Sequence, residues 1–349
     1  MELSKLQQNI IDKKNNKIIV ISAAASGKSR MIIEKARQLL KNGIEPKEVA
    51  VITFTNMAAE ELRQRLGEDY KNGIFIGTIH SLANSFLLSY GIDTSSCIKK
   101  EDFDELFQLV QKYPKCVRKI KYILLDEAQD SNSQQFDFIF NMIQPESFFL
   151  AGDFKQCIYR WNGSEPELIE QLCLEPDVSV CQLNENYRNS QDILNFAKRL
   201  IKPTGLIDDS IPMRHEYGRV IEVPLSINAI ARDIKKDGNY KDWAVLTRSN
   251  RQLEDVYSVF EKQNIPCDTF KQGDLNKEQL TQKMEDNTVK ILTIHSSKGL
   301  EWNKVVVIGA KYNSQEERNI CYVAATRAKD LLVWTTKKDY KKQKLSTWE

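Results

Sequence analysis

Residues 18–29, IIVISAAASGKS, decide the fold of this chain. The apolar run 18–21 predicts a buried strand, and residues 30–40 have the apolar spacing of a helix. A strand, a loop of small residues, Gly-Lys-Ser and a helix, in this order, are typical of a phosphate-binding loop. Lys28 would reach the β- and γ-phosphates of a nucleotide, and Ser29 would hold Mg²⁺. The loop residues expected around the phosphates are Ala24, Ala25, Ser26, Gly27, Lys28, Ser29 and Arg30.

The loop departs from the usual pattern at three small residues. Ser22 stands where the first Gly or Ala is usual, and Ala23 and Ala25 occupy positions where related loops often carry Gly. Alanine lets the backbone approach a ligand, but it is more restricted than glycine at positive φ. On the loop alone, a strand–helix turn with an incidental lysine is the alternative interpretation, so other parts of the chain have to decide.

Composition describes an ordinary globular protein of two or three domains. The chain has 349 residues, of which 41% are hydrophobic and 28% charged. No apolar run approaches the roughly 20 residues of a membrane span, and the N-terminal sequence lacks a signal-peptide pattern. The seven Cys form no CxxC pair and the three His lie far apart, so we expect reduced thiols, a cytoplasmic location and no zinc. With a net charge of +2, any nucleic-acid surface must be a local patch.

Apolar runs alternate with helical patterns from end to end, which predicts an α/β fold with parallel sheets covered by helices on both faces. Because the runs are too numerous for one small sheet, we expect two sheets, with a domain boundary near residue 190. The segment 202–213 reads as a loop inside the second domain. The predicted strands are 18–21, 49–53, 74–77, 122–125, 147–151, 178–183, 219–223, 244–247, 289–294, 304–309 and 331–335.

Two further predicted strands end in polar side chains suited to nucleotide chemistry. Asp126 and Glu127 follow the run 122–125, where Asp126 would serve Mg²⁺ and Glu127 the attacking water. Gln156 follows the run 147–151 and would contact the γ-phosphate or that water. An acidic surface turn is the alternative for the carboxylate pair, but open α/β sheets place ligands at this end of their strands.

Aromatic and polar residues at other strand ends suit contacts with a nucleic acid. Tyr159, Arg160 and Trp161 would face a polymer, with the aromatic rings stacking on bases. The residues Phe54, Thr55 and Asn56 would grip phosphates and stack a base, or else cap a helix. Each of these residues also has a structural interpretation: a core aromatic for Trp161, satisfied structural histidines for His80 and His295, and surface or salt-bridge arginines for Arg188 and Arg327. Taken singly, these alternatives stay open.

Taken together and in order, these segments resemble the superfamily 1A helicases, the UvrD/Rep/PcrA group. The matching segments run from residue 3 to about residue 335: LSKLQQ, SAAASGKS, TFTNMAAEEL, GTIHS, LDEAQD, AGDFKQCIYRWNG, LNENYRN, LTRSN, TIHSSKGLEW and EERNICYVAATRAKD. The resemblance implies two RecA-like domains, residues 1–189 and 190–349, with ATP between them. It also implies ATP hydrolysis coupled to 3′-to-5′ movement on single-stranded DNA.

The resemblance assigns roles residue by residue. Gln7 would recognise adenine, and Glu301 would lie near the nucleotide. Arg188 and Arg327 would act as arginine fingers, and Gln156 would link the γ-phosphate to DNA. The DNA contacts implied are Phe54, Thr55, Asn56, His80, Tyr159, Arg160, Trp161, Arg248, Thr293 and His295.

Two short spacings separate this chain from the large members of the group. Only 46 residues lie from His80 to Asp126 and 43 from Asn250 to Thr293, where large members carry whole inserted subdomains. We expect short insertions instead, at about 92–118 (two short helices, with 101–111 as a candidate) and about 264–287 (one helix and a loop). Independent unwinding of duplex DNA is therefore in question.

Three functions remain in competition at this point. The first is a DNA-stimulated ATPase motor that uses ATP and Mg²⁺ on single-stranded or tailed duplex DNA. The second is a subunit that senses DNA ends or nucleotides for a nuclease partner, as in Gabija-type anti-phage systems. The third is a degenerate nucleotide-binding scaffold, supported only by Ser22, Ala23 and Ala25. We expect no DNA cleavage by this chain alone.

Overall fold

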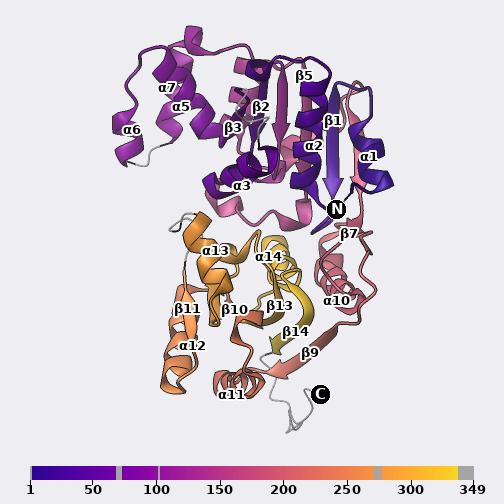
Figure 1. Cartoon of the computed structure of the whole chain (residues 1–349), viewed down its shortest axis with the longest axis vertical. Coiled ribbons are helices and arrows are strands. Elements are labelled where there is room, and N and C mark those ends of the chain that lie inside the picture. Colours follow the sequence, from indigo (N-terminus) through magenta and orange to yellow (C-terminus); the bar gives the residue numbers. More distant parts are fainter. Residues whose placement is uncertain (1, 68–72, 101–102, 271–274, 276, 337–349) are drawn as a thin grey trace. The chain divides into compact units, whose positions relative to one another are not determined.

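A computed structural model describes residues 2–67, 73–100, 103–270, 275 and 277–336 of the chain. The chain divides into two compact units; unit 1 ends at Glu185 and unit 2 begins at Asn186. Each unit is built on a parallel sheet flanked by helices, as the alternating pattern predicts (Figure 1). The Lys-rich segment 337–344 of the sequence lies outside the described residues.

Unit 1 contains a six-stranded sheet of order β3-β2-β4-β5-β1-β6, in which every described pair is parallel. The strands are β1 (Lys17–Ser22), β2 (Val49–Ile52), β3 (Phe75–Gly77), β4 (Tyr122–Leu125), β5 (Ser147–Gly152) and β6 (Ser179–Leu183). The helices are α1 (Lys5–Ile11), α2 (Lys28–Lys41), α3 (Asn56–Leu66), α5 (Ile79–Ser89), α6 (Ser95–Lys100), α7 (Asp104–Lys112), α8 (Ser133–Asp137), the π-helix Phe138–Ile143 and α9 (Glu167–Leu172).

Side chains alternate between the two faces of this sheet, and both faces are buried. Ile18 and Val20 pack with α1, α2 and α3 on one face, whereas Ile19 packs with α5 and α7 on the other. Burial on both faces explains why the strands read as continuous apolar runs. The insertion helices α6 and α7 share the second of these cores, so the segment 92–118 extends unit 1 instead of forming a core of its own.

Unit 2 contains a second parallel six-stranded sheet, of order β11-β12-β10-β13-β14-β9. A two-stranded ribbon pairs β8 with β7, which begins at the last residue of unit 1. The strands are β7 (Glu185–Asn186), β8 (Ile211–Pro212), β9 (Arg219–Pro224), β10 (Trp243–Thr247), β11 (Cys267–Thr269), β12 (Val289–Thr293), β13 (Trp302–Ile308) and β14 (Ala328–Thr336). The helices are α10 (Gln191–Ile201), α11 (Ile227–Asp237), α12 (Asn250–Lys262), α13 (Lys277–Glu285) and α14 (Gln315–Ala325).

The eleven predicted strands are all present, but three further short strands were not predicted. The segment 202–213, expected to be a loop, contributes β8 to the ribbon with β7. The second insertion, expected to be one helix and a loop, holds β11 as well as α13, and β11 adds an edge strand to the sheet. Residues 271–274 and 276 of this insertion, like 101–102 at the start of the candidate helix 101–111, lie outside the described residues.

Candidate functional site

The loop between β1 and α2 forms a cradle for an anion. Gly27 is the N-cap of α2 and adopts a left-handed conformation with φ of 84°. Because glycine has no side chain, this N-cap forms no side-chain hydrogen bond to the first N–H groups of the helix. A Cβ atom at Gly27 would lie 2.8 Å from Nε2 of Gln7, so a side chain here would displace Gln7 and strain a backbone with positive φ. The Oγ atom of Ser26 is buried and has no hydrogen-bond partner. Free N–H groups and a free hydroxyl at a helix N-terminus are what a phosphate group requires.

Two carboxylates follow β4 and lie directly at this cradle. Ser29 Oγ donates a hydrogen bond of 2.6 Å to Oδ2 of Asp126, and Lys28 Nζ lies 3.6 Å from Oε1 of Glu127. Burial raises the pKa of Asp126, the neighbouring charge of Glu127 raises it further, and Lys28 and Ser29 hold it to about 6. The charge of this carboxylate is therefore incompletely compensated within the protein.

The oxygen donors of Ser29 and Asp126 fit a magnesium ion, which prefers hard oxygen ligands and usually takes only one or two carboxylates from the protein. Unit 1 thus brings Lys28, Ser29, Asp126 and Glu127 together, and their roles on phosphate, metal and water stay predictions. Arg30 lies in the first turn of α2, and Ala24, within the loop, is fully buried.

A chain of hydrogen bonds links Glu127 to Gln156 through two residues to which the sequence analysis assigned no role. Gln129 Nε2 donates to Glu127 Oε2 at 2.6 Å, and Gln129 Oε1 accepts from the backbone N–H of Asp153 at 3.0 Å. Asp153, fully buried, accepts a 2.8 Å bond from Gln156 Nε2 and forms a 3.0 Å ion pair with Lys155. Both residues sit in recognisable motifs, but only the fold shows that the ends of β4 and β5 bring them together.

Three predicted DNA contacts form an aromatic cluster beyond Gln156. The rings of Phe54 and Tyr159 stack with centroids 5.0 Å apart, and Tyr159 meets Trp161 edge-on at 6.4 Å. Trp161 is 69% exposed, so it is not a core residue. Thr55 caps α3 by accepting from the N–H of Ala58, as the alternative interpretation had it.

Two other predicted contacts of unit 1 are engaged within the protein. The His80 ring packs between Phe103 and Phe107, with both ring centroids 5.2 Å away, and burial lowers its pKa despite the charge of Asp104. The Gln7 carboxamide donates to the Ser26 carbonyl at 2.8 Å and accepts from the N–H of Ser4 at 3.0 Å. The roles expected for them, on DNA and on adenine, stay predictions.

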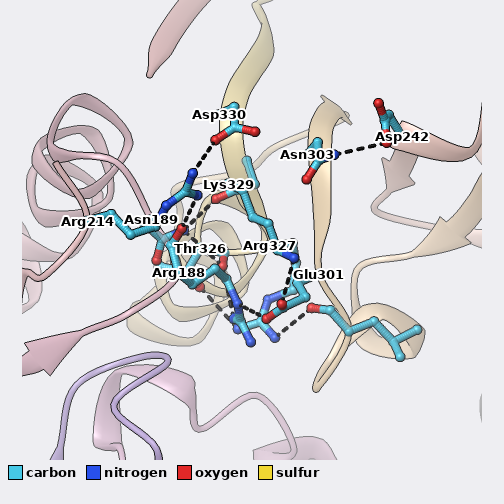
Figure 2. Close-up of polar contacts among 12 residues, drawn as sticks. Arg188, Asn189, Arg214, Asp242, Glu301, Asn303, Thr326, Arg327, Lys329 and Asp330 are labelled. Atoms are coloured by element: carbon cyan, nitrogen blue, oxygen red, sulfur yellow. Dashed lines mark hydrogen bonds and ion pairs between the residues drawn. The ribbon is translucent and has the colours of Figure 1, made fainter. Parts of the chain in front are cut away.

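Arg188, Arg327 and Glu301 meet at the edge of the unit 2 sheet where β13 and β14 begin (Figure 2). Arg188 Nε donates to Glu301 Oε2 at 2.5 Å, and its Nη1 donates to the Thr326 carbonyl at 3.1 Å. Arg327 is 2% exposed and donates to the carbonyls of Val323 and Leu300. Partial burial would raise the pKa of Glu301, but the charges of Arg188 and Lys329 lower it to about 2.

The remaining predicted residues of unit 2 lie at the opposite edge of its sheet, where β10 and β12 end. Arg248 makes two hydrogen bonds, of 2.9 and 2.8 Å, to the Glu317 carboxylate. Thr293 Oγ1 accepts from the N–H of Ser296, and His295 begins the turn that follows. The predicted arginine fingers and the predicted DNA contacts of unit 2 are thus two separate groups.

Two features of other kinds of protein are not found among the residues that the structure describes. Within the described ranges, no helix is both long and apolar enough to cross a membrane. The same part of the chain contains no cluster of three or more His, Cys, Asp or Glu side chains that could hold a metal.

Comparison with known proteins finds two family models that together match nearly the whole chain. The UvrD/REP helicase N-terminal domain matches residues 3–115 and 102–176, and the UvrD-like helicase C-terminal domain matches residues 181–280 and 271–339. Among curated relatives, the ATP-dependent DNA helicase Rep of Buchnera aphidicola (subsp. Acyrthosiphon pisum) is 27% identical over 76% of this chain and 57% of that protein. Rep of Escherichia coli is 25% identical over 76% of this chain and 54% of its own length.

The chain therefore spans little more than half the length of the Rep proteins it matches. The match to the Gabija protein GajB of Bacillus cereus covers 93% of this chain and 93% of GajB, at 24% identity. The likeness to GajB thus extends over both proteins almost in full.

The left-handed conformation of Ala25 predicts that Ala25→Gly stabilises the protein. With φ of 53°, alanine has a steric cost of about 1–2 kcal/mol in the folded state that glycine lacks. Part of the gain from glycine is offset because glycine is more flexible in the unfolded chain. We expect a gain of a few tenths to about 1 kcal/mol in the free energy of unfolding, measured by urea denaturation. The matched control is Ala24→Gly, at a buried position without positive φ, which should destabilise; equal losses in both variants would contradict the assignment.

The packing of His80 predicts a loss of stability in mild acid. Because the folded state lowers the pKa of His80 below its ordinary 6.5, the unfolded chain binds a proton more readily. The contribution of neutral His80 to the free energy of unfolding is complete above pH 6.5. It is lost as the pH falls through the lowered pKa of His80 in the folded protein.

The variant His80→Phe should therefore show a flatter fall in the unfolding midpoint between about pH 7.5 and 5.5. His215→Gln, at an exposed histidine of unit 2, is the control and should keep the slope of the parent protein. An identical slope in His80→Phe and the parent would rule out this contribution.

Proposed function

Because the chain belongs to the UvrD/Rep-like helicase family, we propose that it is an ATP-dependent DNA motor. In this proposal single-stranded DNA stimulates ATP hydrolysis, and each cycle moves the protein in the 3′-to-5′ direction along the strand. The observation that carries the proposal is the arrangement of Lys28, Ser29, Asp126 and Glu127 around one helix N-terminus.

The residues of unit 1 have the chemistry to bind and activate a triphosphate. Lys28 and the N–H groups of the α2 N-terminus bind the phosphates, with the buried Ser26 hydroxyl as an additional donor. Mg²⁺, held by Ser29 and Asp126, would neutralise the charge of the β- and γ-phosphates. Glu127 orients the attacking water and accepts its proton, a role in which Gln129 fixes one of its oxygens.

The arginines of unit 2 supply the positive charge that phosphoryl transfer needs. In the proposal Arg327 and Arg188 reach the γ-phosphate and stabilise the charge that develops on its oxygens. Arg327 is held rigidly by backbone carbonyls, which favours a fixed direction of its guanidinium group. Arg188 is paired with Glu301 and would exchange that partner for the nucleotide.

The hydrogen-bonded chain from Glu127 to Gln156 offers a route from the nucleotide to DNA. Gln156 lies three residues before Tyr159, whose ring stacks on Phe54 beside the exposed Trp161. Each base stacked on such rings contributes about 1–3 kcal/mol of binding. A change in the contacts of Gln156 at the γ-phosphate would therefore move the surface that grips the bases, with the two states selected by ATP and ADP.

A second candidate is a subunit that senses nucleotides or DNA ends for a nuclease partner and unwinds little by itself. The likeness to a Gabija protein over 93% of both chains favours it, as do the short insertions of both units. Forked duplexes with 3′ or 5′ tails separate the two candidates. Unwinding of the 3′-tailed fork by the isolated chain supports the motor, whereas ATP hydrolysis without unwinding, and co-purification of a nuclease, support the second candidate.

The proposed motor predicts that Lys28→Ala abolishes DNA-stimulated ATP hydrolysis. The change removes the charge that meets the β- and γ-phosphates, so both ATP binding and the rate should fall. The measurement is phosphate release with and without oligo-dT. Lys14→Ala, at an exposed lysine of the same unit, should hydrolyse ATP at the parent rate. DNA-dependent hydrolysis that survives Lys28→Ala would overturn the proposed function.

A further inference from the structure

Ser4 lies at the start of α1 and forms a reciprocal capping box with Gln7. Ser4 Oγ accepts a hydrogen bond of 3.1 Å from the N–H of Gln7, and Gln7 Oε1 accepts one of 3.0 Å from the N–H of Ser4. This box satisfies N–H groups at the helix start and holds the Gln7 side chain in one orientation. The other end of the same carboxamide donates to the carbonyl of Ser26 in the phosphate-binding loop.

The contact between Gln7 and the loop is tight and dry. Gln7 is 3% exposed and Ser26 is 1% exposed, so an amide that lost its partner here would not find water. The next residue, Gly27, approaches so closely that a Cβ atom would lie 2.8 Å from Gln7 Nε2. The loop backbone therefore cannot shift at residues 26 and 27 without moving Gln7, or Gln7 without moving the loop.

The hydroxyl of Ser4 has a second partner far away in the sequence. Ser4 Oγ donates a hydrogen bond of 2.5 Å to Oε2 of Glu185. Glu185 is the residue at which unit 1 ends, and the peptide bond after it carries the chain into unit 2. Ser4 is thus hydrogen-bonded both to Gln7, which contacts the loop, and to Glu185, the last residue of unit 1.

We propose that Ser4 is a positioning residue that transmits the state of the phosphate-binding loop to Glu185. The inference rests on the proposed function, since it takes the loop to bind a nucleotide. When phosphates enter the cradle, the backbone at residues 26 and 27 adjusts and Gln7 follows it. Ser4, joined to Gln7 by two hydrogen bonds, shifts its hydroxyl against the Glu185 carboxylate, so that loading of the loop alters the backbone just beyond residue 185.

The segment after Glu185 contains its own reporters of such a change. The backbone N–H groups of Arg188 and Asn189 donate to Oδ1 of Asn186 at 3.1 and 2.8 Å. Amide hydrogens held in this way exchange slowly with solvent, and their exchange rate responds to small changes in local opening. The proposal can therefore be read out by hydrogen exchange, independently of catalysis.

The experiment measures hydrogen–deuterium exchange of residues 186–189 in the full chain, with and without Mg²⁺ and a slowly hydrolysed ATP analogue at a saturating concentration. Bound analogue is determined separately by equilibrium dialysis. In the parent protein, the analogue should change exchange in this segment. The change should be smaller in Ser4→Ala and in Glu185→Ala than in the parent, and should keep its full size in Ser4→Thr, which retains the hydroxyl.

Glu185→Ala leaves the Ser4–Gln7 box intact, so it tests the link even if Ser4→Ala weakens α1. Glu175→Ala, at an exposed carboxylate of unit 1, is the matched control and should respond like the parent. An unchanged response in both Ser4→Ala and Glu185→Ala, with analogue bound, overturns the proposal alone, as does a bound parent whose segment shows no response. A parent that binds no analogue overturns the proposed function, and this inference with it.

Discussion

The burial of charge at the end of β4 is the constraint on which the rest of the structure depends. Asp126 is 3% exposed and Lys28 is 8% exposed, yet Lys28 Nζ lies as far as 3.6 Å from Oε1 of Glu127. A protein that only needed stability would not keep these charges in a poorly hydrated place, because desolvation costs more than such a loose pair returns. Glu127 also adopts a left-handed conformation, with φ of 54°. Incomplete compensation and backbone strain at one point are the marks of a site arranged for a charged ligand.

The parallel sheets explain how residues far apart in the chain reach such a site. In unit 1, the register pairs Ile21 with Gly152 and Leu125 with Leu150, so the phosphate-binding loop, the carboxylates and the Gln156 segment leave the sheet at one edge. In unit 2, Trp302 pairs with Ala328 at the N-terminal ends of β13 and β14. This pairing places Glu301 beside Arg327, the residues that precede the two strands. Each unit therefore presents a distinct group of charged side chains: a cradle with carboxylates in unit 1, and two arginines with a carboxylate in unit 2.

The sequence predicted the long buried elements well, because burial on both faces leaves unbroken apolar runs. It missed β7, β8 and β11, which have two or three residues and take their place only from pairing with distant strands. For the site, motif spacing was enough to select Lys28, Ser29, Asp126 and Glu127, whose side chains the fold brings together. It could not show that Gln129 joins Glu127 to Asp153, that His80 packs between two phenylalanines, or that Ser4 reaches Glu185, because each of these contacts joins segments that only the fold brings together.

The central proposal is that ATP hydrolysis requires the arginines of unit 2 as well as the phosphate cradle of unit 1. The most direct measurement is a comparison of ATP affinity and kcat in Arg327→Lys, which keeps the charge but removes the planar fork, with Arg199→Lys at an exposed arginine of unit 2 as control. The account predicts that ATP affinity changes little while kcat falls by about 10³-fold or more, and that the control is unaffected. A folded Arg327→Lys protein that hydrolyses ATP at nearly the parent rate would contradict it.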